Sequence, residues 1–172
     1  MLQHTKDVGS SPAVGTIQLN FIHKSYLIMN NNVKPFGKYF QFRWKEPLGL
    51  PECPYLYRWT LIFFGYTIRL HHWLRSDDRR YFHDHSCDLI SIIIKGKYTN
   101  VTPNGRFEAV AWKPRKMKAI DRHYLDIPKE GAWTILLCGK PYNKWGFYVN
   151  NHKWRPLRYF HKFGIIQTKD YQ

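Results

Sequence analysis

Two histidines separated by one residue stand just before a run of β-branched residues, and this arrangement restricts the fold more than any other part of the chain. On an extended strand, residues i and i+2 project to the same face, so His83 and His85 can direct two imidazoles at one point. Residues 89–94 are mostly apolar and β-branched, as expected of a buried strand. A histidine pair at the start of such a strand is typical of the mouth of a β-barrel.

A third histidine, His123, follows about one strand pair later. Imidazole is the commonest protein ligand of divalent transition metals, and three imidazoles leave coordination positions open for water or substrate. The alternative is that a His-x-His sequence in a loop is solvated or satisfied by local hydrogen bonds. The buried strand that follows favours a metal site inside a β-structure.

The composition is that of one globular domain. The chain has 172 residues, of which 44% are hydrophobic and 17% aromatic, enough for one sizeable core. No apolar run approaches the roughly 18 residues needed to span a bilayer, and the N-terminus lacks the apolar core of a secretory signal. Three widely spaced cysteines, Cys53, Cys87 and Cys138, form no disulfide framework. We therefore expect a reduced, cytoplasmic protein with no membrane partner.

The chain is strongly basic. Lys and Arg number 27 against 12 acidic residues, giving a formal net charge of +15, and residues 131–169 contain no Asp or Glu. Such an excess favours anionic partners such as nucleotides, nucleic acid or phosphorylated substrates. A basic surface that serves only solubility is the alternative.

Residues 152–163 interleave cations with aromatic rings. Cations for phosphates and rings for base stacking are what a single-stranded nucleic-acid surface needs. The same residues would serve as a strand that packs its rings against a barrel and leaves its charges in solvent. Packing is favoured slightly, because no recognised nucleic-acid motif accompanies the segment. The candidate anion-binding residues are Lys153, Arg155, Arg158 and Lys162.

The order of elements predicts an all-β fold. Residues 1–52 are irregular, with short strands expected at 17–22 and 38–44, and no segment from residue 55 to 150 has a convincing helical period. Many short strands joined by turns indicate a sandwich or a barrel, and we predict a double-sheet jelly roll. Strands are expected at 57–64, 66–73, 89–94, 98–102, 107–112, 123–127, 133–138 and 144–149, with turns at 95–97 and 103–105. The chain is accordingly divided into an N-terminal extension (1–52), a barrel (53–150) and a basic aromatic C-terminal segment (151–172).

The predicted strand at residues 66–73 supplies candidate substrate-binding residues. Alternation places Arg69 and His71 on one face and His72, with its apolar neighbours, on the other. Arg69 and His71 can hold an anionic group, since arginine offers a bidentate fork to carboxylate or phosphate; an ordinary exposed strand residue is the alternative for Arg69. His72 is either directed inward or a core histidine with a backbone partner. Cys87 is either a soft metal ligand or, more simply, a small buried side chain.

The segment from about residue 57 to 149 resembles the cupins, small jelly-roll barrels with two metal-binding motifs. His83, His85 and Gly96 fit the first motif, and His123 fits the second. The chain also resembles small uncharacterised cupin-like proteins of viral and bacterial genomes. The cupin spacing expects an acid where Leu89 stands; its neighbour Asp88 is the best substitute as fourth ligand, and a β-bulge would bring it into register. Asp84, between the two histidines, should face away from the metal.

The resemblance implies a cupin-type jelly roll that binds a divalent transition metal, namely Fe, Mn, Ni or Zn. It implies a metal-dependent enzyme, most often an oxygenase (an oxidoreductase), here acting on a small anionic or nucleotide-like substrate. The alternative is a non-catalytic cupin-fold module that binds a nucleotide or nucleic acid through its basic surface. Cupins often pair through their strands, so a homodimer is expected. No single catalytic residue is indicated.

Overall fold

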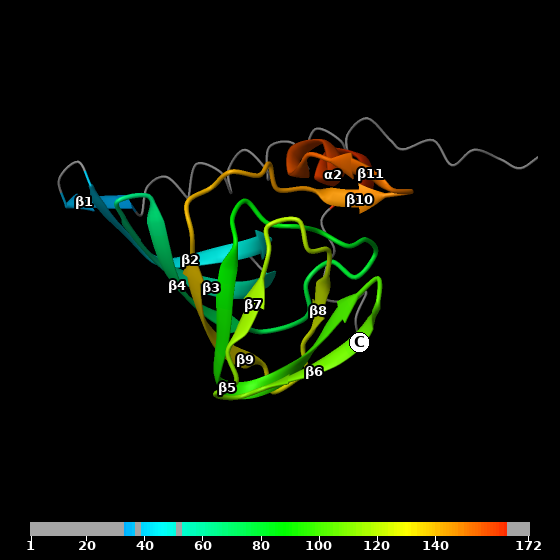
Figure 1. The fold of residues 1–172 in the computed structure, drawn as a ribbon, viewed down its shortest axis with the longest axis horizontal. Coiled ribbons are helices and arrows are strands. Elements are labelled where there is room, and N and C mark those ends of the chain that lie inside the picture. Colours follow the sequence, from blue (N-terminus) through cyan, green and yellow to red (C-terminus); the bar gives the residue numbers. More distant parts are fainter. Residues whose placement is uncertain (1–32, 37–38, 51–52, 165–172) are drawn as a thin grey trace, which may run out of the picture.

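The computed structural model describes residues 33–36, 39–50 and 53–164 of the chain. These residues form a large antiparallel sheet, a separate two-stranded sheet and a short helix (Figure 1). In chain order the elements are β1 (Val33–Phe36), β2 (Phe40–Leu50), β3 (Cys53–Phe63), β4 (Tyr66–Trp73), β5 (Leu89–Thr102), β6 (Gly105–Val110), β7 (Arg115–Met117), β8 (Tyr124–Asp126), β9 (Ala132–Cys138), β10 (Phe147–Val149), β11 (His152–Trp154) and α2 (Pro156–Phe163).

The long strand β5 joins the two walls of the barrel. The sheet order is β1-β2-β3-β4-β9-β5-β6, and β7 and β8 also pair with β5. The first half of β5 pairs with β9 and β7, and its second half pairs with β6 and β8. Between the halves the register shifts after Ile93, and Gly96 has a φ of 81°. The sheet therefore curves round on itself (Figure 1), which confirms the predicted all-β class and matches a jelly roll.

Several sequence-based boundaries differ from the structure. The turn predicted at 95–97 is wrong, because β5 runs through it; glycine adopts the positive φ that a bend needs without ending the strand. The predicted boundary at residue 52 falls inside the pairing of β2 with β3, so the strand expected at 38–44 belongs to the barrel sheet. The strand expected at 17–22 lies outside the described residues. The C-terminal segment contains α2, with proline in its first turn, where a strand was the packing alternative.

The polar face of β4 is the inner one. His71 and Trp73 are each only 7% exposed, whereas Ile68 on the opposite face is 37% exposed. The same parity holds in the flanking strands: His71 lies opposite Arg58 of β3 and Thr134 of β9. The barrel interior therefore carries polar side chains as well as a core.

The apolar core is divided into three clusters. The main one lies among β3, β4, β5, β6, β8 and β9, a second lies between the start of β5 and β9, and a third lies between β10 and α2. Their buried members are, in turn, Leu56, Trp73, Ile93, Tyr98, Ala109, Leu125, Ile127 and Ala132; Cys87, Leu89, Leu136 and Cys138; and Phe147, Val149 and Tyr159.

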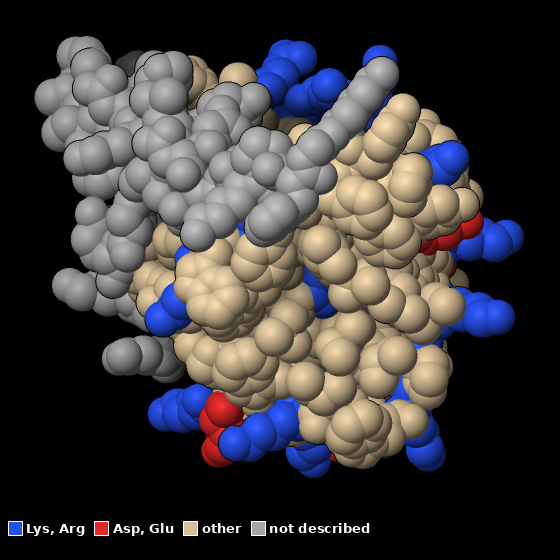
Figure 2. All heavy atoms as spheres, turned by 90° about the vertical axis from the view of Figure 1, so that its left-hand side faces the viewer, with Lys and Arg blue, Asp and Glu red and all other residues tan. Residues whose placement is uncertain are grey.

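The outer face of the β2–β3–β4–β9 wall is largely apolar and exposed. Trp44 is 60% exposed and Leu137 is 40% exposed. Figure 2 shows the side of the molecule on which β2 and β4 lie in Figure 1, and there Lys and Arg lie mainly around the margin while acidic groups are sparse. No helix in the described part of the chain is long and apolar enough to cross a membrane.

Gly96→Ala is expected to lower the free energy of unfolding by about 2–3 kcal/mol. A Cβ at Gly96 would lie 2.7 Å from the carbonyl oxygen of Gly131, in addition to the strain of its positive φ. Urea denaturation measures the change. Gly139→Ala is the matched control, because its Cβ would meet only the Asp88 carbonyl oxygen at 3.4 Å. Equal losses in the two variants would show that the bend in β5 does not require glycine.

Candidate metal centre

The three predicted histidines meet at one point. One nitrogen from each of His83, His85 and His123 lies within 4.8 Å of the others, and Nε2 of His85 is 2.8 Å from Nε2 of His123. Two nitrogens bound to one metal at about 2.1 Å and at right angles are about 3 Å apart. The spacing of this pair therefore suits a shared metal ion.

Backbone pairing brings the histidines together. His83 and His123 form an isolated antiparallel bridge, in which the amide of each donates to the carbonyl oxygen of the other at 2.9 Å. On its other side His83 pairs with Phe147, at the start of β10. The amide of His85 donates to the carbonyl oxygen of Ala119 at 2.9 Å. The i, i+2 spacing then places His85 on the same side as His83, as the sequence predicted.

Asn100 of β5 orients the third imidazole. Its Oδ1 lies 2.5 Å from Nδ1 of His123, and both side chains are buried. Because an amide oxygen only accepts, Nδ1 carries the proton and Nε2 presents a lone pair towards His85. Such outer hydrogen bonds are the usual means by which proteins fix the tautomer of a metal-binding histidine. No sequence pattern predicted this role for Asn100.

Burial keeps the imidazoles neutral. Desolvation lowers the pKa of His83 to about 3 and that of His85 to about 4. The pKa of His123 is also held well below its usual value, first by burial and then by the neighbouring histidines. Neutral imidazole is the form that ligates a metal, so all three residues are ready to do so near neutral pH.

Asp84 faces away from the histidines, as predicted, and holds the C-terminal segment. It is completely buried, and Oδ1 accepts the amide of Gly146 at 2.8 Å. Oδ2 accepts from Asn143 Nδ2 and the Tyr148 hydroxyl, each at 3.0 Å, and pairs with the Lys153 ammonium. A buried carboxylate with this many donors is fully satisfied. Asp84, between His83 and His85, therefore holds β10 and β11 next to the two histidines.

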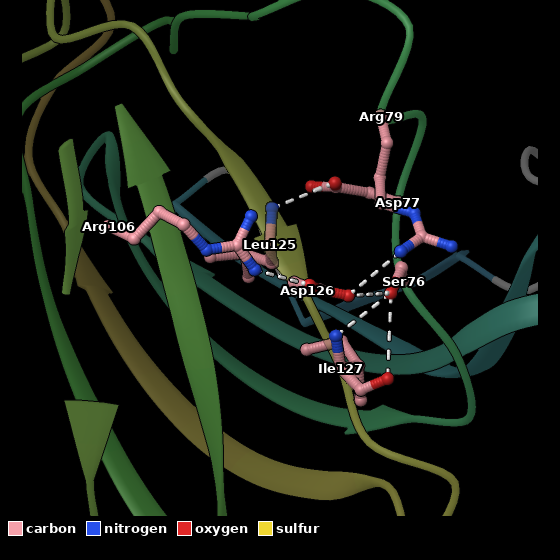
Figure 3. Close-up of polar contacts among 7 residues, drawn as sticks. All are labelled: Ser76, Asp77, Arg79, Arg106, Leu125, Asp126 and Ile127. Atoms are coloured by element: carbon pink, nitrogen blue, oxygen red, sulfur yellow. Dashed lines mark hydrogen bonds and ion pairs between the residues drawn. The ribbon is translucent and has the colours of Figure 1, made fainter. Parts of the chain in front are cut away.

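A loop between β4 and His83 supports the centre from the other side (Figure 3). The amide of Leu125 donates to Asp77 Oδ1 at 2.9 Å, and the amide of Ile127 donates to the Ser76 hydroxyl at 2.9 Å. Oδ1 of Asp126 accepts a hydrogen bond from Arg79 at 3.1 Å, and Oδ2 accepts one from Arg106 at 2.8 Å. Figure 3 draws the residues of this network, Ser76, Asp77, Arg79, Arg106, Leu125, Asp126 and Ile127. The segment that carries His123 is thereby tied to the loop that leads to His83.

The carboxyl group beside the triad is that of Asp77, for which no sequence pattern predicted a role at the site. Its Oδ2 lies 3.8 Å from Nε2 of His83, and burial raises its pKa well above the usual value. Asp88, the predicted fourth ligand, is not in the cluster. It is exposed, and its Oδ1 accepts the amide of Ala119 at 2.7 Å and the Tyr142 hydroxyl at 2.6 Å. No bulge brings it into register, so it directs its carboxylate outward at the start of β5.

The predicted substrate-binding residues are divided between two faces. Arg69 and His71 lie on the inner face of β4, and the positive charge of Arg69 acts on the ring of His85. His72 is directed outward, where its ring stacks on Trp133 with centroids 4.2 Å apart. The inward orientation considered for His72 is therefore wrong, because alternation gives that direction to His71. Cys87 is buried among apolar neighbours, outside the histidine cluster.

The basic tail packs aromatic rings against β10 and keeps its cations at the surface. Tyr159 is completely buried and stacks on Phe147 with centroids 4.0 Å apart. Lys153, predicted to bind anions, is instead the ion-pair partner of Asp84. Arg158 lies over the ring of Trp154, with its guanidinium carbon 4.9 Å from the centroid, and Arg155, Arg158 and Lys162 are all exposed.

Comparison with known proteins finds similar solved structures but no similar sequence family. No protein-family model matches the sequence, and no curated protein does. The chain is similar to a cupin domain from Bordetella pertussis, with 13% identity over 42% of this chain and 79% of that one and a TM-score of 0.36. It is similar to a cupin-2 domain from Rhodospirillum rubrum, with 13% identity over 64% of this chain and 80% of that one and a TM-score of 0.45. It is also similar to hydroxypropylphosphonic acid epoxidase from S. wedmorenis, with 12% identity over 55% of this chain and a TM-score of 0.41. The match spans 56% of the length of that protein.

The fold is cupin-like. The chain's own features carry this assignment: an antiparallel sheet closed by a bent β5, a histidine pair before that strand, and a third histidine before β8.

Asn100→Ala is expected to weaken metal binding by about 10- to 100-fold, because His123 loses the partner that fixes its tautomer. Competition with a chromophoric zinc chelator measures the affinity. Asn104→Ala, in the turn before β6, is the control and should bind as the wild type does. Equal weakening in both variants would contradict the role assigned to Asn100.

The metal-free protein is expected to lose stability as the pH falls below about 6.5. Below that pH the histidines of the unfolded chain are protonated. In the folded protein the buried imidazoles of His83 and His85 stay neutral until the pH falls to about 3–4. The free energy of unfolding should be lower at pH 5 than at pH 7 by about 2 kcal/mol for each histidine. Urea titrations at the two pH values test this, and His85→Gln should remove its own share. A dependence unchanged in that variant would show that His85 titrates normally.

Proposed function

We propose that the protein is a metal-dependent cupin enzyme, of oxygenase type, that acts on a small anionic or nucleotide-like substrate. The observation that supports this is the convergence of three neutral imidazoles at the edge of a polar barrel interior.

The donor set fits a divalent transition metal. Three imidazole nitrogens suit Fe, Mn, Ni or Zn, and a three-ligand site keeps positions open. A metal held there supplies Lewis-acid chemistry and, if it is iron, the redox chemistry that an oxygenase needs. The protein's own residues orient the ligands through Asn100, exclude water by burying His123, and provide the acid of Asp77 next to His83.

The charge of the chain supports an anionic substrate. The net charge is +15, and Arg69, on the inner wall, acts electrostatically on His85 of the triad. The second candidate function is a non-catalytic module that binds a nucleotide or nucleic acid through its basic surface. The exposed Arg155 and Lys162 keep this alternative open.

Elemental analysis of protein purified without chelator or tag metal tests the proposal. About one transition metal per chain is expected in the wild type and none in His83→Ala or His123→Ala. Asp88→Ala should keep its metal, because Asp88 lies outside the cluster. Metal-free wild-type protein that also fails to take up iron or zinc from solution would overturn the proposal.

Protein reconstituted with iron(II) also tests for open coordination positions. Nitric oxide, a surrogate for dioxygen, should produce an iron–nitrosyl signal in the electron paramagnetic resonance spectrum. The signal should be absent from His123→Ala. If metal is absent and charge reversals at Arg155 and Arg158 abolish nucleotide or oligonucleotide binding, the second candidate function takes the place of the first.

A further inference from the structure

The inner wall formed by β3, β4 and β9 carries polar atoms without partners. Among the described residues, no hydrogen bond is made by Nε of Arg69, by Oγ1 of Thr60 or by either ring nitrogen of His71, although all these atoms are buried. Thr60 is 4% exposed and His71 is 7% exposed. A polar group that is buried without a partner destabilises the protein, so several such groups together indicate a ligand-binding site.

These atoms are adjacent. Thr60 pairs with Arg69 across β3 and β4, and Arg58 pairs with His71 one step further along the same two strands. Arg69 and Arg58 act electrostatically on His71, and Arg69 also acts on His85 of the metal centre. The unpaired atoms therefore line the barrel wall next to the three histidines.

The charge balance of this wall is positive. Arg43, Arg58 and Arg69 share the inner face with one acid, Glu46. Glu46 is already engaged, since Oε2 accepts Nε of Arg58 at 3.1 Å and Oε1 lies 3.7 Å from Nη1 of Arg43. The strands β3, β4, β5 and β9 contain no Asp or Glu. In the part of the chain that the structure describes, Arg69 thus has no acidic partner, and an unpaired charge is costly to keep inside a protein.

We propose that Arg69, Thr60 and His71 form the binding site for one compact oxyanion group, a carboxylate or a phosphate, of a small substrate that enters the barrel. Guanidinium provides the bidentate fork, the threonine hydroxyl donates a third hydrogen bond, and neutral His71 donates a fourth. The rest of the substrate then extends towards the three histidines. The inference rests on the proposed function for the metal, but the anion site itself needs only the residues of the wall.

The test uses ¹⁵N-labelled, metal-free, full-length protein at low ionic strength, titrated separately with glycolate, inorganic phosphate and neutral glycolamide. Glycolate or phosphate should shift the arginine Nε–H resonance that disappears in Arg69→Met, and glycolamide should not. By calorimetry, Arg69→Met should weaken binding of the oxyanion by roughly 10- to 100-fold, the loss of one charge-assisted interaction. The relative affinities for glycolate and phosphate decide between a carboxylate and a phosphate substrate.

Two further variants separate a binding site from a structural role. Lys116→Met removes one exposed positive charge of β7 and should bind the oxyanion within twofold of the wild type. Thr60→Val should weaken binding and yet raise the melting temperature of the free protein, because it removes an unpaired buried hydroxyl. A merely structural threonine would give lower stability with unchanged binding.

Each remaining outcome counts against the inference. It is overturned if neither oxyanion shifts the Arg69 resonance, if glycolamide binds as well, or if Lys116→Met loses as much affinity as Arg69→Met. It is also overturned if only oligonucleotides bind and Arg69→Met does not affect them. Metal uptake is measured on the same preparations: metal without oxyanion binding defeats this inference alone, and oxyanion binding without metal defeats the proposed function alone.

Discussion

The backbone bridge between His83 and His123 is the constraint on which the candidate site depends. Its two reciprocal 2.9 Å hydrogen bonds join residues forty positions apart in the chain and bring the imidazoles together. The bridge is isolated and lies outside the long strands, so it needs support. Asp84 provides it from the side of β10, and Asp77 provides it from the side of β8. Oδ1 of Asp84 accepts the amide of Gly146 and Oδ1 of Asp77 accepts the amide of Leu125, so these two oxygens are satisfied without a metal.

The polar interior accounts for the apolar exterior of the same wall. A strand has only two faces, so once Arg69 and His71 are directed into the barrel, Ile68 must be directed outward. This arrangement leaves buried polar atoms of Arg69 and His71 without hydrogen-bond partners among the described residues, which is unfavourable for the free protein. Proteins tolerate such unfavourable burial at sites where a ligand offsets it. The distribution of polarity therefore indicates function more directly than the overall fold does.

The sequence predicted the features that depend on local periodicity and missed those that depend on distant contacts. His83 and His85 follow from the two-residue repeat of a strand, and alternation correctly divided the side chains of β4 into two sets. It did not say which set faces inward, because hydrophobicity favours the apolar one. Asp77 was unremarkable in a charged loop, since its partner Leu125 is 48 positions away.

The element boundaries that were missed have local causes. Gly96 resembles a turn signal in sequence, but its positive φ bends a continuous β5 instead of ending it. The helix α2 has eight residues, too few for a helical period to stand out, and its clearest signal is Pro156 in the first turn. Asp88 stands next to the motif position of the acid, but in the structure its carboxylate accepts hydrogen bonds from the Ala119 amide and the Tyr142 hydroxyl.

The C-terminal segment shows why composition alone overstates the basic surface. Lys153 neutralises Asp84, and Arg80 binds the last turn of α2 by donating to the carbonyl oxygens of Phe163 and Gly164 at 2.6 and 2.8 Å. The hydroxyl of Tyr159 donates to Asp78 at 2.8 Å, in the same loop that supports Asp77. Part of the positive charge is thus used to attach this segment to both sides of the histidine bridge. Arg69, on the inner face of β4, has no acidic partner among the described residues, and its unpaired Nε supports the proposed anion site inside the barrel.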